Sequence, residues 1–427
     1  MTREGKKHRM PPPDVLSNLP DCVIDEILVK LPLRDVVRTS ILSRKWRCNW
    51  CRLPHLKLDQ TLWKTSKDLI SPTIGYANVL SHILTLHTRP ITKFTLDIPD
   101  LGTCPNIDHF ICFLSRNGIK HLVLKPPQYK LYKLPSSFFT CSQLRHLSLE
   151  HCLIRPPPLF KGFDRLISLQ LIEVVISSEF LGSFISHCPL LEHLVLKLDQ
   201  EPYDVEINAP NLRSFIFAGH INFLHFKNAP LLSKVSYSPI LLYGEEKFDV
   251  AKFLESIPAL ENFCWEHNSV LTMQFGPDEV IPTRLPSALY SLKHLCISRI
   301  TPGEFFDLSL ALCLIRSSPN LKEIEIKAYT CANYDEPVFQ SVVDKIPASF
   351  SDMTFNHLKS VKINNVAGLE AELQLIEVLL AKSPTLVKMV IQPCRMRDKK
   401  SLKLLAEITN FQRASSKAQV VYNIVID

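Results

Sequence analysis

One apolar pattern recurs through this chain and limits the folds that the chain can adopt. An apolar residue is followed three and five positions later by two more apolar residues, and this pattern occurs thirteen times between residues 53 and 391. Successive units begin 20–25 residues apart in the middle of the chain and 28–38 residues apart towards its ends. The first residues of the units are Leu53, Ile91, Ile119, Leu144, Leu166, Leu191, Leu212, Leu232, Leu260, Leu292, Leu321, Leu358 and Leu386.

The spacing within each unit predicts one short strand, and the interval between units leaves room for a helical or irregular return. A unit of this size cannot bury its apolar face alone, so neighbouring units must stack and share one continuous core. The sequence therefore predicts an α/β leucine-rich-repeat solenoid of parallel strands, with convex helices over residues 180–191, 250–260 and 308–321. The first, fourth and sixth positions of each unit point inward, and the residues between them lie on the concave face. An ordinary α/β domain with leucine-rich strands is the alternative, and the large number of units argues against it.

Prolines mark the start of many units. The chain has 31 prolines and only 11 glycines, and six units carry a proline two positions before their first apolar residue. Proline has no amide donor and cannot continue a helix, so each of these residues is predicted to end the return segment just before the strand. The six are Pro189, Pro210, Pro230, Pro258, Pro319 and Pro384.

The first 50 residues differ from the repeats. Residues 16–50 contain three short amphipathic helical patterns separated by Leu-Pro breaks. Ser17 or Asn18 is a candidate cap for the first helix, in which Pro20 takes the first turn and Asp21 complements the helix dipole. Such a small unit cannot bury its apolar surface well, so we expect it to cover that surface with a partner. The apolar residues are Val23, Ile24, Ile27, Leu28 and Leu31 in the first helix, Val36, Val37 and Ile41 in the second, and Trp46 and Trp50 in a third from Ser43.

The same segment resembles the F-box of plant proteins. It matches the plant pattern at Leu19-Pro20, Ile27-Leu28, Leu31-Pro32, Arg38-Thr39-Ser40, Leu42-Ser43, Trp46-Arg47 and Trp50. The resemblance implies that the segment binds a Skp1-like adaptor and, through it, a cullin. Internal packing is the alternative role for each candidate contact, and for Trp46 in particular. The adaptor contacts carried over to this chain are Leu19, Pro20, Ile24, Ile27, Leu31, Val37 and Trp46.

The C-terminal segment resembles a second plant module. Residues 350–427 contain strand, helix, strand, helix and strand patterns in that order, and they resemble the FBD domain that follows leucine-rich repeats in many plant F-box proteins. Its last strand is predicted to cap the edge of the solenoid. The whole chain thus resembles the plant F-box/FBD/LRR-repeat family. The expected organisation is a disordered basic tail at 1–14, an F-box at 15–60, repeats at 61–349 and an FBD-like domain at 350–427.

The family resemblance implies a substrate receptor of an SCF-type (Skp1–cullin–F-box) ubiquitin ligase, a non-catalytic subunit whose repeats hold a target protein. Two alternatives stay open: an interaction scaffold that assembles no ligase, and a receptor that holds a small molecule in the repeat groove. His121 and His146 fall in consecutive repeats and are expected to be neighbours. The residues expected to line the target groove are His121, His146, Ser148, Gln170, His193, Asn262, Glu266 and His294.

The sequence carries no catalytic motif, since P-loop, GxGxxG, HExxH and GxSxG patterns are all absent. Cys48 and Cys51 form a lone C-x-x-C without a second pair at zinc spacing, so we expect no metal and no cofactor. The net charge of +7 lies largely in the first 60 residues, and the balanced remainder argues against a nucleic-acid surface. No apolar run reaches the length of a membrane span, and the 13 scattered cysteines favour a reducing compartment. The expected location is therefore the cytoplasm or the nucleus.

Overall fold

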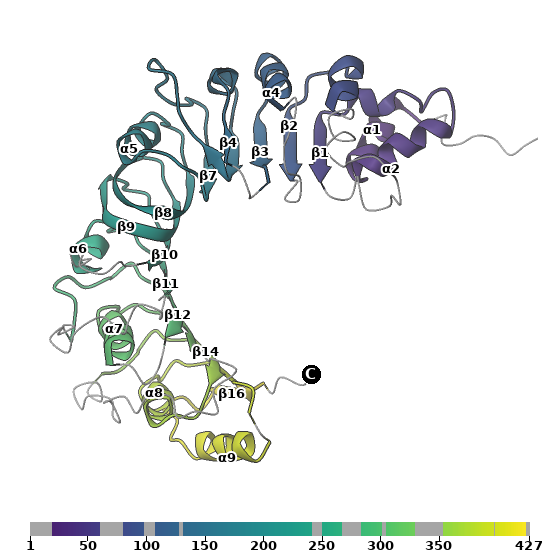
Figure 1. Cartoon of the computed structure of the whole chain (residues 1–427). Coiled ribbons are helices and arrows are strands. Elements are labelled where there is room, and N and C mark those ends of the chain that lie inside the picture. The colour runs from purple at the N-terminus through teal and green to yellow at the C-terminus, as the bar shows by residue number, and fades with distance from the viewer. Residues whose placement is uncertain are drawn as a thin grey trace, which may run out of the picture. The chain divides into compact units, whose positions relative to one another are not determined.

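The computed structural model describes residues 19–59, 80–97, 107–127, 131–240, 250–266, 283–300, 305–328, 353–396 and 398–423 (Figure 1). The chain divides into two compact units, Met1–Arg165 and Leu166–Asp427. The predicted tail over residues 1–14 lies outside the described residues. The first helix begins at Asp21 with Pro20 at its N-cap and without a side-chain cap hydrogen bond, so the prediction that Ser17 or Asn18 caps it is wrong. The predicted domain boundaries stay predictions, because this division follows compactness and not the sequence modules.

Unit 1 combines short helices with a parallel sheet. Its strands pair in the order β1-β2-β3-β5, and β4 pairs separately with β6. The helices are α1 (Asp21–Val29), α2 (Leu33–Arg38), η1 (Thr39–Ile41), η2 (Asn49–Arg52), α4 (Ile107–Arg116) and η4 (Ser136–Thr140). The strands are β1 (His55–Asp59), β2 (Lys93–Asp97), β3 (His121–Lys125), β4 (Tyr132–Lys133), β5 (His146–Glu150) and β6 (Cys152–Leu153).

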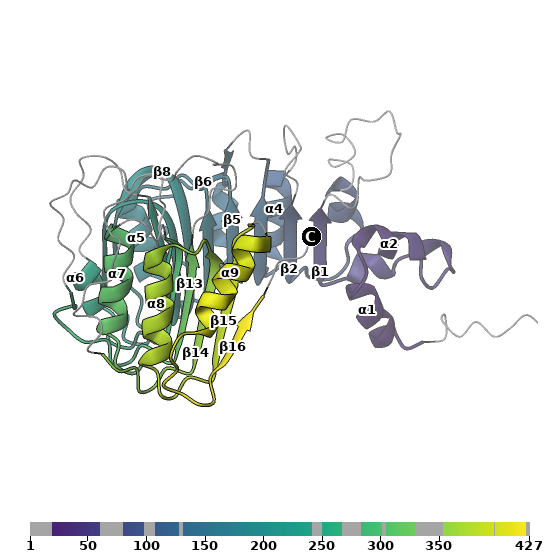
Figure 2. The same cartoon turned by 90° about the horizontal axis from the view of Figure 1, so that it is seen from below.

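Unit 2 is a parallel sheet in strict chain order, with helices along one of its faces. Figure 1 shows the helices on one side of the strands, and Figure 2 shows α7 and α8 running side by side along them. The strands are β7 (Ser168–Ile172), β8 (His193–Asn208), β9 (Ser214–Asn228), β10 (Lys234–Ile240), β11 (Asn262–Glu266), β12 (His294–Ile300), β13 (Glu323–Ala328), β14 (Ser360–Val366), β15 (Lys388–Pro393) and β16 (Gln419–Tyr422). The helices are α5 (Ser178–Ser186), α6 (Val250–Glu255), α7 (Phe305–Arg316), α8 (Glu370–Ala381) and α9 (Asp398–Thr409).

All thirteen predicted repeat units form a parallel strand, which confirms the solenoid. The three apolar positions of every unit are at most 4% exposed. Neighbouring strands align these positions in register, as in Phe263↔Leu295 and Trp265↔Ile297 between β11 and β12. Each unit therefore contributes its apolar residues to a core shared with its neighbours, and the residues between them form the opposite, helix-free face, called the open face below. The helices predicted over 180–191, 250–260 and 308–321 are present as α5, α6 and α7, ending a few residues earlier.

The six prolines occupy equivalent turns. In each case the residue before the proline accepts a backbone hydrogen bond from the first apolar residue of the next unit, as in Leu191 N to Cys188 O at 3.1 Å and Leu386 N to Ser383 O at 3.2 Å. Proline suits the second position of such a turn because its fixed φ matches the turn and its missing amide is not needed there. The proline spacing therefore marks the entry to each strand, as predicted.

The units that contain β8 and β9 depart from the expected strand-and-helix pattern. β8 and β9 are 16 and 15 residues long, and they pair a second time after a register shift, with Val205 opposite Leu224 and Ile207 opposite Phe226. These four side chains are buried. Paired strand extensions thus cover the core here, where other units use a helix.

Residues 353–396 and 398–423 follow the predicted order, β14–α8–β15–α9–β16. At the entry to α8, Glu372 is 6% exposed and accepts backbone hydrogen bonds from Ala367, Gly368 and Leu369 at 2.8–2.9 Å. Burial nevertheless raises the pKa of this carboxyl above its usual range. The carboxyl therefore fixes the loop between β14 and α8. The identity of this segment as an FBD domain stays a prediction from the sequence.

Candidate functional site

The F-box segment has a small core built from two helices. Ile24 and Leu28 of α1 are fully buried, and Leu33 and Val36 of α2 are 8% and 1% exposed. Trp46, which follows α2, is 3% exposed. The predictions that Ile24 and Trp46 contact the adaptor are corrected, because side chains enclosed in the folded domain cannot reach a partner docked on it.

The predicted third α-helix is also absent from the F-box as described. From Ser43 the chain makes turns up to residue 48, and then the short 3-10 helix η2. Tryptophan, asparagine and cysteine in this stretch are modest helix formers, and Leu53-Pro54 stops the chain from continuing a helix. The burial of Trp46 therefore comes from packing of an irregular segment and not from helical spacing.

A second row of apolar side chains on the same helices faces outward. Ile27 and Leu31 are each 39% exposed and Val37 is 44% exposed, so three of the predicted contacts are accessible. Pro20 is exposed as well, and Leu19 is half-buried. Four further exposed apolar residues were not among the predicted contacts, although Leu42 belongs to the F-box pattern. We call the full exposed set the F-box apolar surface: Val23, Ile27, Val29, Leu31, Val37, Ile41 and Leu42.

Exposed apolar residues are concentrated in this segment. Seven of the seventeen exposed large apolar side chains in the described part of the chain lie between residues 23 and 42. Isolated exposed apolar residues are normal, but a concentration of them marks an interaction surface. The arrangement is therefore suited to binding an apolar partner surface.

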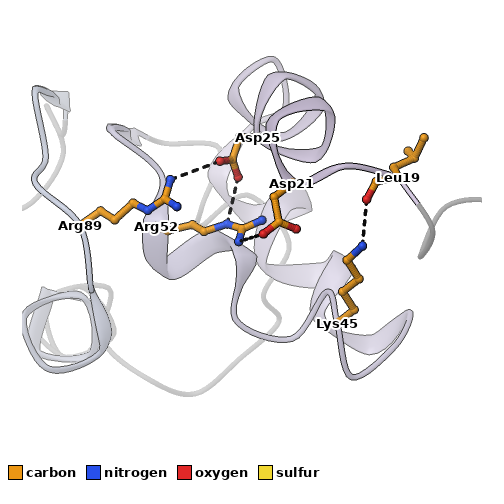
Figure 3. A network of polar contacts seen from close by, with 6 residues as sticks. All are labelled: Leu19, Asp21, Asp25, Lys45, Arg52 and Arg89. Carbon is orange, nitrogen blue, oxygen red and sulfur yellow. Dashed lines mark hydrogen bonds and ion pairs between the residues drawn. The ribbon is translucent and has the colours of Figure 1, made fainter.

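A polar network holds α1 against the rest of the F-box (Figure 3). Arg52 of η2 donates from Nε to Asp25 at 3.0 Å and from a terminal nitrogen to Asp21 at 2.9 Å. Arg89 approaches the other oxygen of Asp25 at 3.5 Å, and Lys45 donates to the Leu19 carbonyl at 2.8 Å. The charged hydrogen bonds from Arg52 to Asp21 and Asp25 fix the orientation of α1, and therefore the direction in which Ile27 and Leu31 project.

Asp21→Asn is expected to lower the unfolding temperature at pH 7, and the loss should shrink at pH 3. The hydrogen bond and the positive charge of Arg52 hold the pKa of Asp21 below its ordinary value of 3.8. A lowered carboxyl pKa stabilises the folded state above the unfolded pKa, and this stabilisation disappears as the pH falls through the folded value. Thermal unfolding of both proteins at the two pH values measures the difference.

Asp35→Asn serves as the matched control for this experiment. Among the described residues, Asp35 forms an ion pair across one helical turn with Arg38, at 3.5 Å on the surface, where such pairs contribute little. We expect a small shift for this variant at both pH values. An equal loss for Asp21→Asn at pH 7 and pH 3 would contradict a role for the ionised carboxylate.

In unit 1 the open face carries a pair of stacked histidines. His121 and His146 are register partners on β3 and β5, and their rings lie 4.4 Å apart at an angle of 7°. This confirms the expectation that they are neighbours. Burial contributes most to lowering the pKa of His121, and the nearby His146, Lys93 and His55 lower it further. The imidazole of His121 is therefore mostly neutral at pH 7.

Ser148 corrects the predicted groove set in unit 1. Its side chain is 8% exposed, because it is shorter than the side chains of His146 and Glu150 on the same face of β5. A serine at this depth offers little to a large target. The accessible polar groups of this face are therefore its longer neighbours.

In unit 2 the open face is hollowed into a groove of about 440 Å³ between β9 and β14. Two of the predicted target residues, Asn262 and His294, line it as register partners on β11 and β12. Gln170, His193 and Glu266 lie on the same face of unit 2 outside the groove lining. The sequence prediction omitted other lining residues, among them Lys234, Ser236, Cys264, Cys296 and Glu325.

Charged pairs close one end of this groove. Glu325 of β13 accepts from Lys362 of β14 at 2.9 Å and lies 3.6 Å from Lys327. Partial burial by itself favours a higher pKa for Glu325. The contacts with Lys362, Lys327 and Asn364 outweigh this effect, so the pKa of Glu325 lies below its usual range. His294 contacts Glu323 at 2.9 Å. The groove therefore offers both signs of charge beside small and apolar groups, a composition suited to recognising a protein surface.

The described residues contain no group of three or more histidine, cysteine, aspartate or glutamate side chains placed to hold a metal ion. No described helix is long and apolar enough to cross a membrane. The structure presents two candidate interaction surfaces, the F-box apolar surface and the groove on the open face of unit 2. A small helical F-box segment followed by a leucine-rich-repeat solenoid defines an F-box protein of the leucine-rich-repeat class.

Comparisons with known proteins agree with this class. Residues 16–57 match the family model of the F-box domain, and residues 107–326 match the model described as "FBD-associated F-box protein At5g56370, LRR repeats". The F-box/FBD/LRR-repeat protein At1g13570 of Arabidopsis thaliana is 32% identical over 96% of this chain and 98% of its own length. The F-box/LRR-repeat protein 13 of the same plant is 25% identical over 96% of both chains. The chain belongs to the F-box/FBD/LRR-repeat family.

Proposed function

We propose that this protein is the substrate receptor of an SCF-type ubiquitin ligase. The observation that carries the proposal is the F-box apolar surface, because its side chains are exposed in the free chain and rest on a core of their own. Fully burying an exposed isoleucine or leucine side chain contributes about 1.5–3 kcal/mol, so burial of this set against an adaptor would favour docking. The proposed contacts are Leu19, Pro20, Ile27, Leu31 and Val37 from the original prediction, together with Val23, Ile41 and Leu42.

The proposed role of the repeats is to hold a target protein for ubiquitin transfer. The groove between β9 and β14 supplies hydrogen-bonding groups such as Asn262, the charges of Lys234 and Glu325, and a floor of small side chains. Mixed polar contacts around a few anchors are typical of protein recognition. In this role the chain is a non-catalytic subunit that binds neither nucleic acid nor membrane.

A small-molecule receptor is the second candidate function. It is favoured by the groove volume of about 440 Å³, which falls within the roughly 300–1,000 Å³ of ligand pockets. In that case a ligand in the groove would complete the surface that the target binds.

We propose the cytoplasm or nucleus as the location, in line with the free thiols of the described cysteines.

Affinity purification of the tagged chain from proteasome-inhibited plant cells tests the function. The expected result is recovery of a Skp1-like adaptor, a cullin and at least one ubiquitinated protein. Recovery of the adaptor without cullin would indicate an interaction scaffold, and recovery of neither would overturn the proposal. Thermal shifts of the purified adaptor complex against a panel of small molecules would reveal the receptor alternative.

A further inference from the structure

Two cysteines lie side by side on the floor of the unit 2 groove. Cys264 of β11 and Cys296 of β12 are register partners, and both line the groove with half-buried side chains. Adjacent strands are about 4.8 Å apart, within the separation of Cα atoms that a disulfide spans. Both thiols are free, so they form an accessible dithiol.

The two thiols are not equivalent. Cys296 accepts a hydrogen bond from the Cys264 thiol, and its Sγ lies 3.5 Å from Ser298 Oγ. These hydrogen bonds and the Lys327 charge outweigh burial and the Glu325 charge, and they lower the pKa of Cys296 to about 6. Its partnership with Cys296, together with burial, raises the pKa of Cys264. Cys296 is therefore the more acidic thiol of the pair, and Cys264 is the less acidic one beside it.

This environment differs from that of other described cysteines. Burial raises the pKa of Cys141 to about 12, and it also raises the pKa of Cys152. Burial chiefly raises the pKa of Cys51, and the nearby Cys48 raises it further. Reactive cysteines combine thiolate character, partial exposure and a nearby resolving thiol, and the groove pair combines all three.

We propose that Cys296 and Cys264 form a reversible thiol-oxidation site that reacts with hydroperoxides. The Cys296 thiolate attacks the peroxide, so that an S–O bond forms, the O–O bond breaks and the released alkoxide or hydroxide takes a proton from solvent. The Cys264 thiol then gives up its proton and attacks the sulfenic sulfur; the S–S bond forms, and the hydroxyl leaves as water. Together, two thiols and one hydroperoxide give a disulfide, an alcohol or water, and a further water.

The sheet geometry favours reversibility. Side chains of directly paired residues on parallel strands point the same way, so their Cβ atoms stay near the strand spacing of about 4.8 Å, wider than a relaxed disulfide prefers. A strained disulfide is reduced more readily by cellular thiols. Oxidation would also remove a negative charge from the groove floor. An effect on target binding rests on the proposed function, whereas the thiol chemistry does not.

Peroxide titration of the purified full-length protein tests the site. After treatment with hydrogen peroxide, free thiols are blocked with iodoacetamide and the digest is analysed by mass spectrometry. The expected product is a linked peptide pair containing Cys264 and Cys296, lighter than the two reduced peptides by two hydrogen atoms and released by dithiothreitol. Persistence of both thiols while other cysteines are oxidised would overturn the proposal.

Single variants separate the two roles. Cys296→Ser should slow oxidation of Cys264 at least about tenfold, whereas Cys264→Ser should leave Cys296 as a sulfenic acid that dimedone traps. Cys51→Ser is the matched control, and it should leave the linked peptide unchanged. Equal oxidation of Cys264 with and without Cys296 would contradict the assignment. Unchanged thermal unfolding of the serine variants confirms that each one is folded, and the result is independent of adaptor binding.

Discussion

Replacing Ile27 and Leu31 together with aspartate is expected to weaken binding of a Skp1-like adaptor at least about a hundredfold. Ile27 lies on α1 and Leu31 lies two residues after its end, and both side chains are 39% exposed. Each would lose its apolar burial in the complex, and a desolvated carboxylate would oppose docking. Binding of the purified variant to immobilised adaptor, measured by interferometry, gives the affinity ratio.

Two comparison variants identify the cause of the loss. Leu402→Asp changes an equally apolar side chain, 60% exposed on α9, and should leave adaptor binding unchanged. Ile24→Ala instead removes a fully buried side chain and should destabilise the F-box by about 2–5 kcal/mol. Adaptor binding retained by the Ile27/Leu31 double variant would show that the F-box apolar surface is not the docking surface.

Gly219→Ala is expected to destabilise unit 2 by at least about 3 kcal/mol. Gly219 has φ +132°, and a Cβ atom added there would lie 1.9 Å from the Leu198 carbonyl oxygen and 2.6 Å from its carbon. Neither atom can move without separating β8 from β9, where Leu198 and Gly219 are register partners. Urea unfolding followed by circular dichroism measures the loss.

Gly182→Ala is the matched control for Gly219→Ala. This glycine lies within α5, and its added Cβ would lie 3.4 Å from the Glu206 carbonyl oxygen. Alanine favours a helix over glycine by about 1 kcal/mol, so the variant should stay within about 1 kcal/mol of the parent. Similar unfolding midpoints for both variants would contradict the close approach of β8 and β9.

The repeats could be predicted from the sequence because the signal is local and repeated. A strand alternates its side chains between two faces, so the three apolar positions identify the buried face without knowledge of the neighbours. The proline two positions earlier, as at Pro189 and Pro319, marks a turn whose geometry depends on only four residues. Both signals gave the strand order and the shared core, and the structure confirms them.

The F-box shows where such reasoning stops. Ile24 and Ile27 are both apolar and lie one turn apart on α1, yet one is fully buried and the other is 39% exposed. Helical spacing places them on adjacent stripes, and only the packing of α2 and Trp46 decides which stripe is enclosed. For the same reason Trp46 was ambiguous in the sequence, since an aromatic side chain suits a core and an interface equally.

The sequence by itself determined the stacked parallel repeats, the turns that precede their strands and the membership of the F-box segment in its class, because each depends on residues close together in the chain. The tertiary structure alone decided which apolar residues of the F-box stay exposed, and how β8 and β9 replace a helix with a second pairing. The second pairing depends on the register between strand segments about 20 residues apart in the chain. A local pattern does not encode that register, because it is set by the packing of one unit on the next.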